Sequence, residues 1–170
     1  MAKQEKVKRT NKPESEFDNR VISVRRVSKA TKGGRNMSFS ALVVVGDKKG
    51  RVGIGSGKSS EVPMAIEKAI QSAKKNLITI PIVGTSIPHE VLGKFSKAST
   101  LLMPAKEGTG VIAGGASRAV IELCGIKDIL TKAYGARNKI NSVKATLEGL
   151  KSLRTVEQVA ALRGKLPEEI

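Results

Sequence analysis

The sequence predicts an α+β fold in two domains, a three-stranded antiparallel sheet with a packed helix followed by a second α+β domain. Apolar and polar residues alternate across residues 21–57, as they do in half-buried strands. Apolar residues then recur every three or four positions over 62–77, the period of an amphipathic helix. The charge balance also changes, because residues 17–80 hold 13 basic and 4 acidic residues whereas 81–170 hold 13 and 8. We therefore place a domain boundary near residue 82.

The first domain is expected to begin with an antiparallel meander over residues 21–57. Its first turn, residues 29–35, contains Gly33 and Gly34, which permit the positive φ of a tight hairpin tip. The second turn, residues 47–50, starts with Asp and ends with Gly, a composition typical of a type I turn. We expect one apolar face on this sheet, formed by Phe39, Ala41, Val43, Val45, Val52 and Ile54.

A helix is expected after the meander, with a start signal at Ser59-Ser60-Glu61, where a hydroxyl cap precedes an acid in the first turn. Its inward positions would be Val62, Ala65, Ile66, Ala69, Ile70, Ala73 and Leu77. Residues 77–84 are predicted to be an extended connector, restricted by Pro81.

The second domain is expected to mix short strands with helices. We predict strands near 87–92, 99–104 and 128–133, and helices near 116–123, from Asn141 or Ser142 onward, and from a Thr155/Gln158 capping box to Gly164. Arg118 and Glu122 would form a pair on the first of these helices. The predicted division is a basic flexible tail at 1–16, domains at 17–80 and 81–164, and a short tail at 165–170.

The composition restricts the class of partner. A net charge of +16 and a pI near 10.2 favour nucleic acid or an anionic membrane surface. No run of about 18 apolar residues exists, so a membrane span is not expected. The first 16 residues lack the apolar core of a secretory signal, and the single cysteine, Cys124, excludes an internal disulfide. We expect a soluble, basic, intracellular protein.

The scarcity of aromatic residues predicts how RNA would be bound. Modules that stack bases need exposed aromatics, and this chain has three Phe and one Tyr. Binding is therefore expected to use phosphates, shape and 2′-hydroxyls. The candidate RNA-binding residues are Arg20, Arg25, Arg26, Lys29, Lys32, Gly33, Gly34, Arg35, Arg51 and Lys58.

Several of these features, and the glycines of the third expected strand, also have a purely structural interpretation. The basic cluster at 29–35 could be a solvated turn. Arg25 and Arg26 would point to opposite faces of a regular strand. The glycines at 53, 55 and 57 could allow close approach of RNA, or equally the tight packing of a helix.

Several ordered motifs resemble the bacterial form of small-subunit ribosomal protein five. They include Val24-Arg25-Arg26-Val27-Ser28-Lys29, Lys32-Gly33-Gly34-Arg35, Gly50-Arg51-Val52-Gly53, residues 107–115, Ala133-Tyr134-Gly135 and residues 144–150. The resemblance runs from about residue 17 to the C-terminus. It implies an N-terminal domain like those that bind double-stranded RNA, and a second α+β domain.

That resemblance also implies a function and a set of partners. The protein would bind ribosomal RNA in the small subunit of the cytoplasmic ribosome, stabilise the head relative to the body and contribute to translational accuracy. Small-subunit ribosomal proteins four and eight would be its protein partners, and the interface with protein four would use Glu107, Gly108, Thr109, Gly110 and Arg118. Whether it also holds messenger RNA where the message enters the subunit stays open. Neither a cofactor nor a homo-oligomer is expected.

Two other functions remain as alternatives at this stage. A free module that binds double-stranded RNA outside the ribosome would share the same charge pattern. A nucleotide-binding enzyme is suggested by residues 108–113, which fit Gly-x-Gly-x-x-Ala, but the βαβ context of that fingerprint is missing. Gly57-Lys58-Ser59 is only a near match to a P-loop. One Cys and one His make no usual zinc site, and no nucleophile–base pair is evident.

Overall fold

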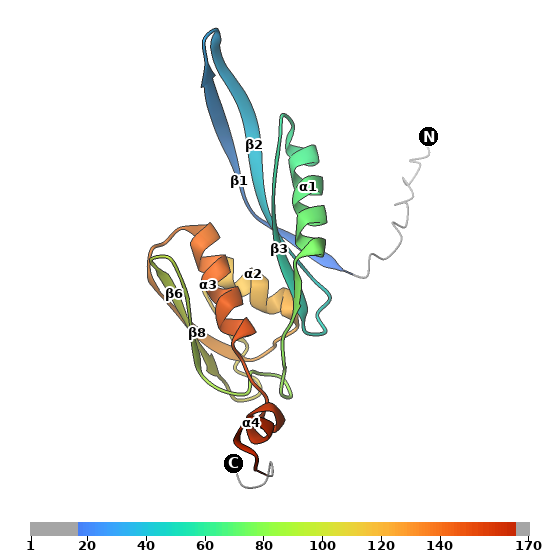
Figure 1. Cartoon of the computed structure of the whole chain (residues 1–170), viewed down its shortest axis with the longest axis vertical. Coiled ribbons are helices and arrows are strands. Elements are labelled where there is room, and N and C mark those ends of the chain that lie inside the picture. Colours follow the sequence, from blue (N-terminus) through green and yellow to red (C-terminus); the bar gives the residue numbers. More distant parts are fainter. Residues whose placement is uncertain (1–16, 166–170) are drawn as a thin grey trace, which may run out of the picture.

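A computed structural model describes residues 17–165 and shows two α+β domains stacked end to end, with a long hairpin projecting from the first (Figure 1). The expected tail at 1–16 and residues 166–170 lie outside the described part. The first domain combines a sheet of order β1-β2-β3-β4 with helix α1, Val62–Lys75. The second has a sheet of order β5-β6-β8-β7, helices α2 and α3, and a last helix α4. The predicted fold class is confirmed.

The first sheet contains the three predicted strands and one more. These are β1 Asp18–Thr31, β2 Gly34–Gly46 and β3 Arg51–Ser59, all antiparallel. The fourth strand, β4 Leu77–Thr79, lies where we expected a plain connector and pairs with β3 through Val52 and Ile78. The extended conformation of this segment was predicted, but three residues are too few for an alternating pattern that would indicate pairing.

Helix α1 packs on β3 through small residues. Ala65, Ala69 and Ala73 are fully buried, and the glycines of β3 lie beneath them. A Cβ atom added at Gly55 would lie 2.0 Å from the carbonyl oxygen of Ala69, and one at Gly57 would lie 2.3 Å from that of Ala65. The glycines of β3 therefore allow tight helix packing, which was one of their two interpretations.

The start of α1 differs from the prediction. The N-cap residue is Glu61, its side chain makes no capping hydrogen bond, and the first turn holds no acidic residue. Proline occupies the first turn, where its missing N–H costs nothing and its fixed φ suits a helix. Pro63 therefore supplies the start that we had assigned to the serine hydroxyls.

The first sheet is buried on both faces, whereas we predicted one apolar face. Ala41, Val43 and Val45 pack with α1, and Leu42 and Val44 are buried on the opposite side. Val44 pairs with Ile54, and Val43 pairs with Gly55. Val52 and Ile54 therefore belong to the second face, and the prediction that they lie beside Val43 was wrong. It assumed the wrong register across the turn at 47–50.

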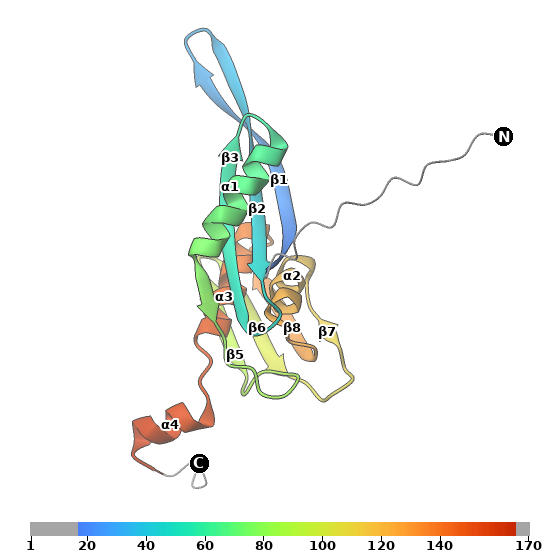
Figure 2. The ribbon, with the colours of Figure 1, turned by 90° about the vertical axis from the view of Figure 1, so that its right-hand side faces the viewer.

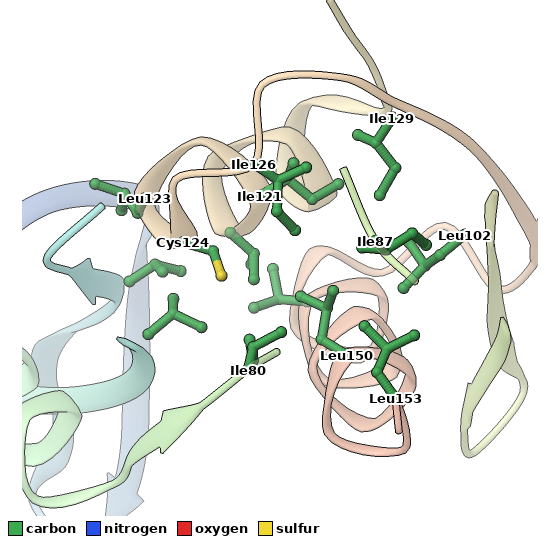
Figure 3. Packing of buried hydrophobic residues seen from close by; sticks show 14 residues of the cluster. Ile80, Ile87, Leu102, Ile121, Leu123, Cys124, Ile126, Ile129, Leu150 and Leu153 are labelled. Atoms are coloured by element: carbon green, nitrogen blue, oxygen red, sulfur yellow. The ribbon is translucent and has the colours of Figure 1, made fainter. Parts of the chain in front are cut away.

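The second face of the sheet packs on α2, Gly115–Cys124, so that α1 and α2 lie on opposite sides of it (Figure 2). One hydrophobic cluster crosses between the domains and includes Val44, Val52 and Ile80 together with Ile121, Cys124 and Leu150 (Figure 3).

Backbone hydrogen bonds join the domains at the same place. Lys48 N donates to Leu123 O at 3.0 Å, and Gly50 N donates to Cys124 O at 2.8 Å. Because the domains share a core and a hydrogen-bonded seam, the hairpin has a fixed direction relative to the second domain.

The second sheet is built from β5 Val91–Phe95, β6 Ala98–Pro104, β7 Val111–Ile112 and β8 Ile129–Gly135. Strand β7 runs parallel to β8, and the other pairs are antiparallel. The strand expected near 87–92 begins later, at Val91. Ile87 is buried, but it lies in the irregular segment before that strand.

The last two helices differ in how well their starts were predicted. Helix α3, Lys139–Lys151, begins before the predicted Asn141 or Ser142, because Asn138 is the cap and its side chain accepts a hydrogen bond from Ile140 N at 3.2 Å. Helix α4, Val156–Arg163, has the predicted Thr155/Gln158 capping box. It ends at Gly164, whose φ is 65°.

Within residues 17–165, no helix is long and apolar enough to cross a membrane.

Candidate nucleic-acid interface

The hairpin arm, which we define as residues 27–38, extends beyond the rest of its sheet. Pairing between β2 and β3 stops at the pair Phe39 and Ser59. Pairing between β1 and β2 continues beyond that point, to the pair Thr31 and Gly34. The arm is thus a two-stranded ribbon without a covering helix (Figure 1). Most of its side chains are exposed, so their charges are available to a partner.

The tip of the arm is a two-residue turn, Lys32-Gly33, between Thr31 and Gly34. Gly34 has a φ of 141°, while Gly33 keeps an ordinary value, so only one of the two glycines is needed for the backbone conformation. A Cβ atom at either glycine would meet nothing within 4 Å. Thr31 Oγ1 donates to Gly34 O at 3.0 Å and closes the turn. The tip is therefore slender and unobstructed.

The strand register divides the predicted cations between two faces. Arg25 pairs with Ser40, and Ser40 pairs with Lys58, so these residues form a row across three strands. This row lies on the face that packs on α2 lower in the sheet, and Lys29 lies on the same face.

The opposite face of the arm is also basic. Arg35 of the arm pairs with Ala30 on the α1 side of the sheet, and Arg26, just before the arm, pairs with Phe39 on the same side. Arg25 and Arg26 therefore point to opposite faces, as the alternation of a regular strand predicts. Cations on both faces and Lys32 at the tip give the arm a positive surface all round.

Two of the predicted RNA-binding residues already have partners within the protein. Arg20 forms an ion pair with Glu122 of α2. Arg51 Nε donates to Asp47 Oδ2 at 2.6 Å, and its guanidinium lies over the ring of Phe17, 5.2 Å from the ring centroid. Burial opposes ionisation of Asp47, but hydrogen bonds from Arg51 and from the Lys49 N–H outweigh it and lower the pKa of that carboxyl.

The loop at 107–110 lies between β6 and β7 and is held in place by a hydrogen bond to Asp128. Gly108 and Gly110 have φ values of 86° and 75°. Gly110 N donates to Asp128 Oδ1 at 2.8 Å. The pKa of Asp128 is lowered by that hydrogen bond and by another from the Thr85 hydroxyl, against the opposing effect of burial. The ionised carboxylate thus fixes the shape of an exposed loop.

Arg118 lies beside this loop, but its partner is not the one we predicted. Its Nη2 donates to the carbonyl oxygen of Val111 at 3.3 Å. Glu122, four residues further along α2, pairs with Arg20 instead, because β1 crosses α2 at that point. The predicted pair on the helix surface was therefore wrong, and Arg118 remains exposed next to residues 107–110.

The alternative chemistries find no support in the described residues. Gly108 and Gly110 precede a strand, β7, rather than opening a helix as a dinucleotide fingerprint would. No group of three or more His, Cys, Asp or Glu within residues 17–165 could hold a metal ion. Burial raises the pKa of the Cys124 thiol to about 12. His89 contacts Glu90 O through Nδ1 at 2.9 Å and accepts from Arg154 N at 3.2 Å, a structural role.

A further group of cations was missed from the sequence. Lys132, Arg137 and Lys139 line a groove of about 800 Å³ together with Arg20 and Tyr134. They fall within eight consecutive residues, 132–139, where three positive charges flank the single tyrosine. That local density was the available signal, and only the fold shows that Arg20 faces the same groove.

Comparison with family models identifies both domains. Residues 17–81 match the model described as ribosomal protein S5, N-terminal domain. Residues 93–163 match the ribosomal protein S5, C-terminal domain, in the same order. The two matches cover most of the chain, and this non-enzymatic family supplies structural components of the small ribosomal subunit that bind ribosomal RNA. The chain, with its basic hairpin arm and its second α+β domain, belongs to the ribosomal protein S5 family.

Proposed function

We propose that the hairpin arm grips ribosomal RNA through the sugar–phosphate backbone and thereby stabilises the head of the small subunit relative to its body. The observation that carries this proposal is the arm itself, a ribbon that leaves its own sheet and is basic on both faces. Val27 and Ser38 are its only partly buried residues, so it contributes little to the core of the protein. An extended basic element that contributes little to the core is suited to binding an anionic partner such as RNA.

The chemistry of the arm favours contacts with phosphates over contacts with bases. Residues 27–38 contain no aromatic side chain that could stack on a base. Lys29, Lys32 and Arg35 supply charge to phosphate oxygens, and the bare backbone at Gly33 and Gly34 allows close approach. Such binding depends strongly on salt, because each neutralised phosphate releases counterions.

The rigid link between the domains supports a role in holding two parts of the subunit together. The shared cluster around Val44 and Ile121, and the hydrogen bonds of Lys48 and Gly50 to α2, fix the arm relative to the second domain. A protein bound to RNA at both ends can then restrain the motion of one RNA domain against another. Flexibly joined domains would transmit no such restraint.

We also propose that residues 107–110 and Arg118 contact small-subunit ribosomal protein four and contribute to translational accuracy. This loop lies far from the arm (Figure 2), is exposed, and has a fixed conformation because Gly110 is bonded to Asp128. Small-subunit ribosomal protein eight is a further proposed neighbour in the cytoplasmic ribosome. This proposal rests on the sequence motifs that resemble the bacterial form of small-subunit ribosomal protein five.

Reconstitution of the small subunit tests the role of the arm. Salt-washed subunits lacking this protein are mixed with the wild-type chain or with Arg35→Glu, and sedimented at several salt concentrations. Charge reversal on the arm should release the protein at lower salt, and Lys68→Glu, an exposed residue on α1, is the matched control. Equal retention of Arg35→Glu and wild type would contradict the proposal. Equal affinity of the wild type for ribosomal RNA and for arbitrary duplexes would favour a free RNA-binding module.

Misreading rates test the second interface. Arg118→Ala removes an exposed guanidinium whose only described hydrogen bond is to the Val111 carbonyl, so the fold should tolerate the change. We expect misreading in a reporter assay to change about twofold or more, an interface effect of about 0.4 kcal/mol. Lys127→Ala, which also removes an exposed cation, is the control. An unchanged misreading rate in Arg118→Ala would count against contact with protein four.

A further inference from the structure

A groove between the two domains has the features of a second RNA-binding site, separate from the hairpin arm. It measures about 800 Å³ and is bounded by β1, the first turn of α2, the end of β8 and the start of α3. That volume lies within the range of about 300–1,000 Å³ that is common for ligand pockets. The groove is therefore large enough to take in a nucleotide.

The charge of the groove favours an anionic occupant. Arg20, Lys132, Arg137 and Lys139 line it, and none of its lining residues is acidic. Glu122 neutralises Arg20 from outside the groove, which leaves three cations on the second domain without a described acidic partner. The uncapped N-terminal end of α2, at Gly114 and Gly115, adds its partial positive charge to theirs.

Tyr134 gives the groove an aromatic surface that the rest of the protein lacks. Its side chain is 50% exposed. Phe17 and Phe39, by contrast, pack against the cluster beneath α1, and Phe95 lies under Lys144 Nζ at 4.7 Å. The tyrosine is thus the aromatic ring that lies open among basic side chains, the combination that binds single-stranded nucleic acid.

The neighbours of Tyr134 leave its ring accessible. Strand alternation places Lys132, two residues earlier in β8, on the same face as Tyr134, and the small Ser99 lies opposite Tyr134 on β6. Gly135 has a φ of 74° and leads the chain away toward Arg137 and Lys139. Tyr134 and the two cations that follow it all line the same groove.

Strand β1 connects the groove to the arm. Arg20 lines the groove, and Arg25 and Lys29 lie on the same face of β1 toward the tip, beyond the bulge at residue 22. This spacing places a positive charge at intervals from the groove to the arm. An RNA strand leaving the groove along β1 would meet cations throughout.

We propose that this groove binds an unpaired RNA nucleotide, with the base stacked on Tyr134 and the flanking phosphates held by Lys132 and Arg137. The site goes beyond the proposed function of the arm, because it reads an unstacked base where the arm contacts only the sugar–phosphate surface. Duplex RNA, whose bases are stacked on one another, would not satisfy it.

The test uses the full-length protein and a short fluorescein-labelled oligouridylate, with affinity measured by anisotropy. We expect Tyr134→Ala to weaken binding about fivefold or more, since one stacked base is worth that much or more. Tyr134→Phe keeps the ring and should bind like the wild type. The double variant K132A/R137A should also weaken binding, whereas K68A/R163A, which removes the same charge elsewhere, should have a much smaller effect.

Ultraviolet cross-linking supplies a readout that a structural role would not change. Irradiation of the wild-type complex should give a uridine adduct on the peptide that contains Tyr134. The arm variant Arg35→Glu should keep that adduct, which separates failure of the groove from failure of the arm. The proposal would be overturned if Tyr134→Ala bound oligouridylate as tightly as the wild type. It would also be overturned if irradiation of assembled small subunits cross-linked the groove to another protein and not to RNA.

Discussion

Glycines serve opposite purposes at the tip of the hairpin arm and in strand β3, some tens of residues apart. A Cβ atom at Gly33 would meet nothing within 4 Å, whereas one at Gly55 would lie 2.0 Å from the carbonyl oxygen of Ala69. The first glycine keeps the outside of the protein slender for a partner, and the second lets a helix approach its own sheet. The same residue type therefore marks function in one place and stability in the other.

The largest expected effect is on stability, from Gly55→Ala. The added methyl group cannot be accommodated without moving α1, because the atom it meets is backbone. We expect the free energy of unfolding to fall by about 3 kcal/mol, the upper part of the usual range for overpacking. Thermal unfolding followed by circular dichroism measures this change.

Gly33→Ala is the matched control for that experiment. Its φ is ordinary and the surrounding space is open, so the unfolding free energy should change by about 0.5 kcal/mol or less. If the two substitutions destabilised the protein equally, the proposed difference between the glycines of the tip and those of β3 would be wrong.

A smaller effect on RNA binding, with none on stability, is expected from Gly33→Asp. The carboxylate fits the open space but repels phosphate at the tip. Affinity for ribosomal RNA should fall about tenfold, or about 1.4 kcal/mol. Filter binding across a salt series measures the affinity, and the slope of log affinity against log salt should become shallower. If the variant unfolded at a lower temperature than the wild type but bound RNA with unchanged affinity, Gly33 would have a structural role like that of Gly55.

Acid should weaken the seam at residues 47–50 and the loop at 107–110. The pKa values of Asp47 and Asp128 are both lowered below the ordinary range of an aspartate by hydrogen bonds that the folded state supplies. Their stabilising contribution is complete above the unfolded pKa and is lost as the pH falls through the lower folded values. Asp128→Asn should therefore destabilise the protein at neutral pH, and the difference from the wild type should shrink as the pH falls through the lowered folded-state pKa of Asp128. Urea unfolding at a series of pH values tests this, and a constant difference would contradict it.

The sequence predicted the arm better than it predicted the packing behind it. Alternation and the two adjacent glycines are local signals, and they correctly indicate the hairpin and the opposite faces of Arg25 and Arg26. The second buried face of the sheet depends on α2, which comes more than 50 residues after β3. No local pattern shows that Val52 faces a helix so distant in the chain.

The site residues show the same limit. Arg20 and Arg51 read as free cations in the sequence, but the fold gives them Glu122 and Asp47 as partners. Asp47 is four residues from Arg51 and could have been considered, whereas Glu122 is 102 residues from Arg20. Long-range ion pairs of this kind follow from strand and helix crossing, which a single sequence does not specify.

The smallest expected effect concerns Arg20, which combines a structural and an RNA-binding role. It joins the domains through Glu122, and it also lines the groove. The pair with Glu122 is solvent-exposed, with side chains 52% and 37% accessible, and exposed pairs contribute about 0–1 kcal/mol. Glu122→Gln should therefore lower the unfolding free energy by less than about 1 kcal/mol. It also frees the guanidinium, so affinity for oligouridylate should stay equal or rise. A fall in affinity would mean that the carboxylate positions Arg20 for RNA, and the distinction between structural and RNA-binding residues would then fail at this position.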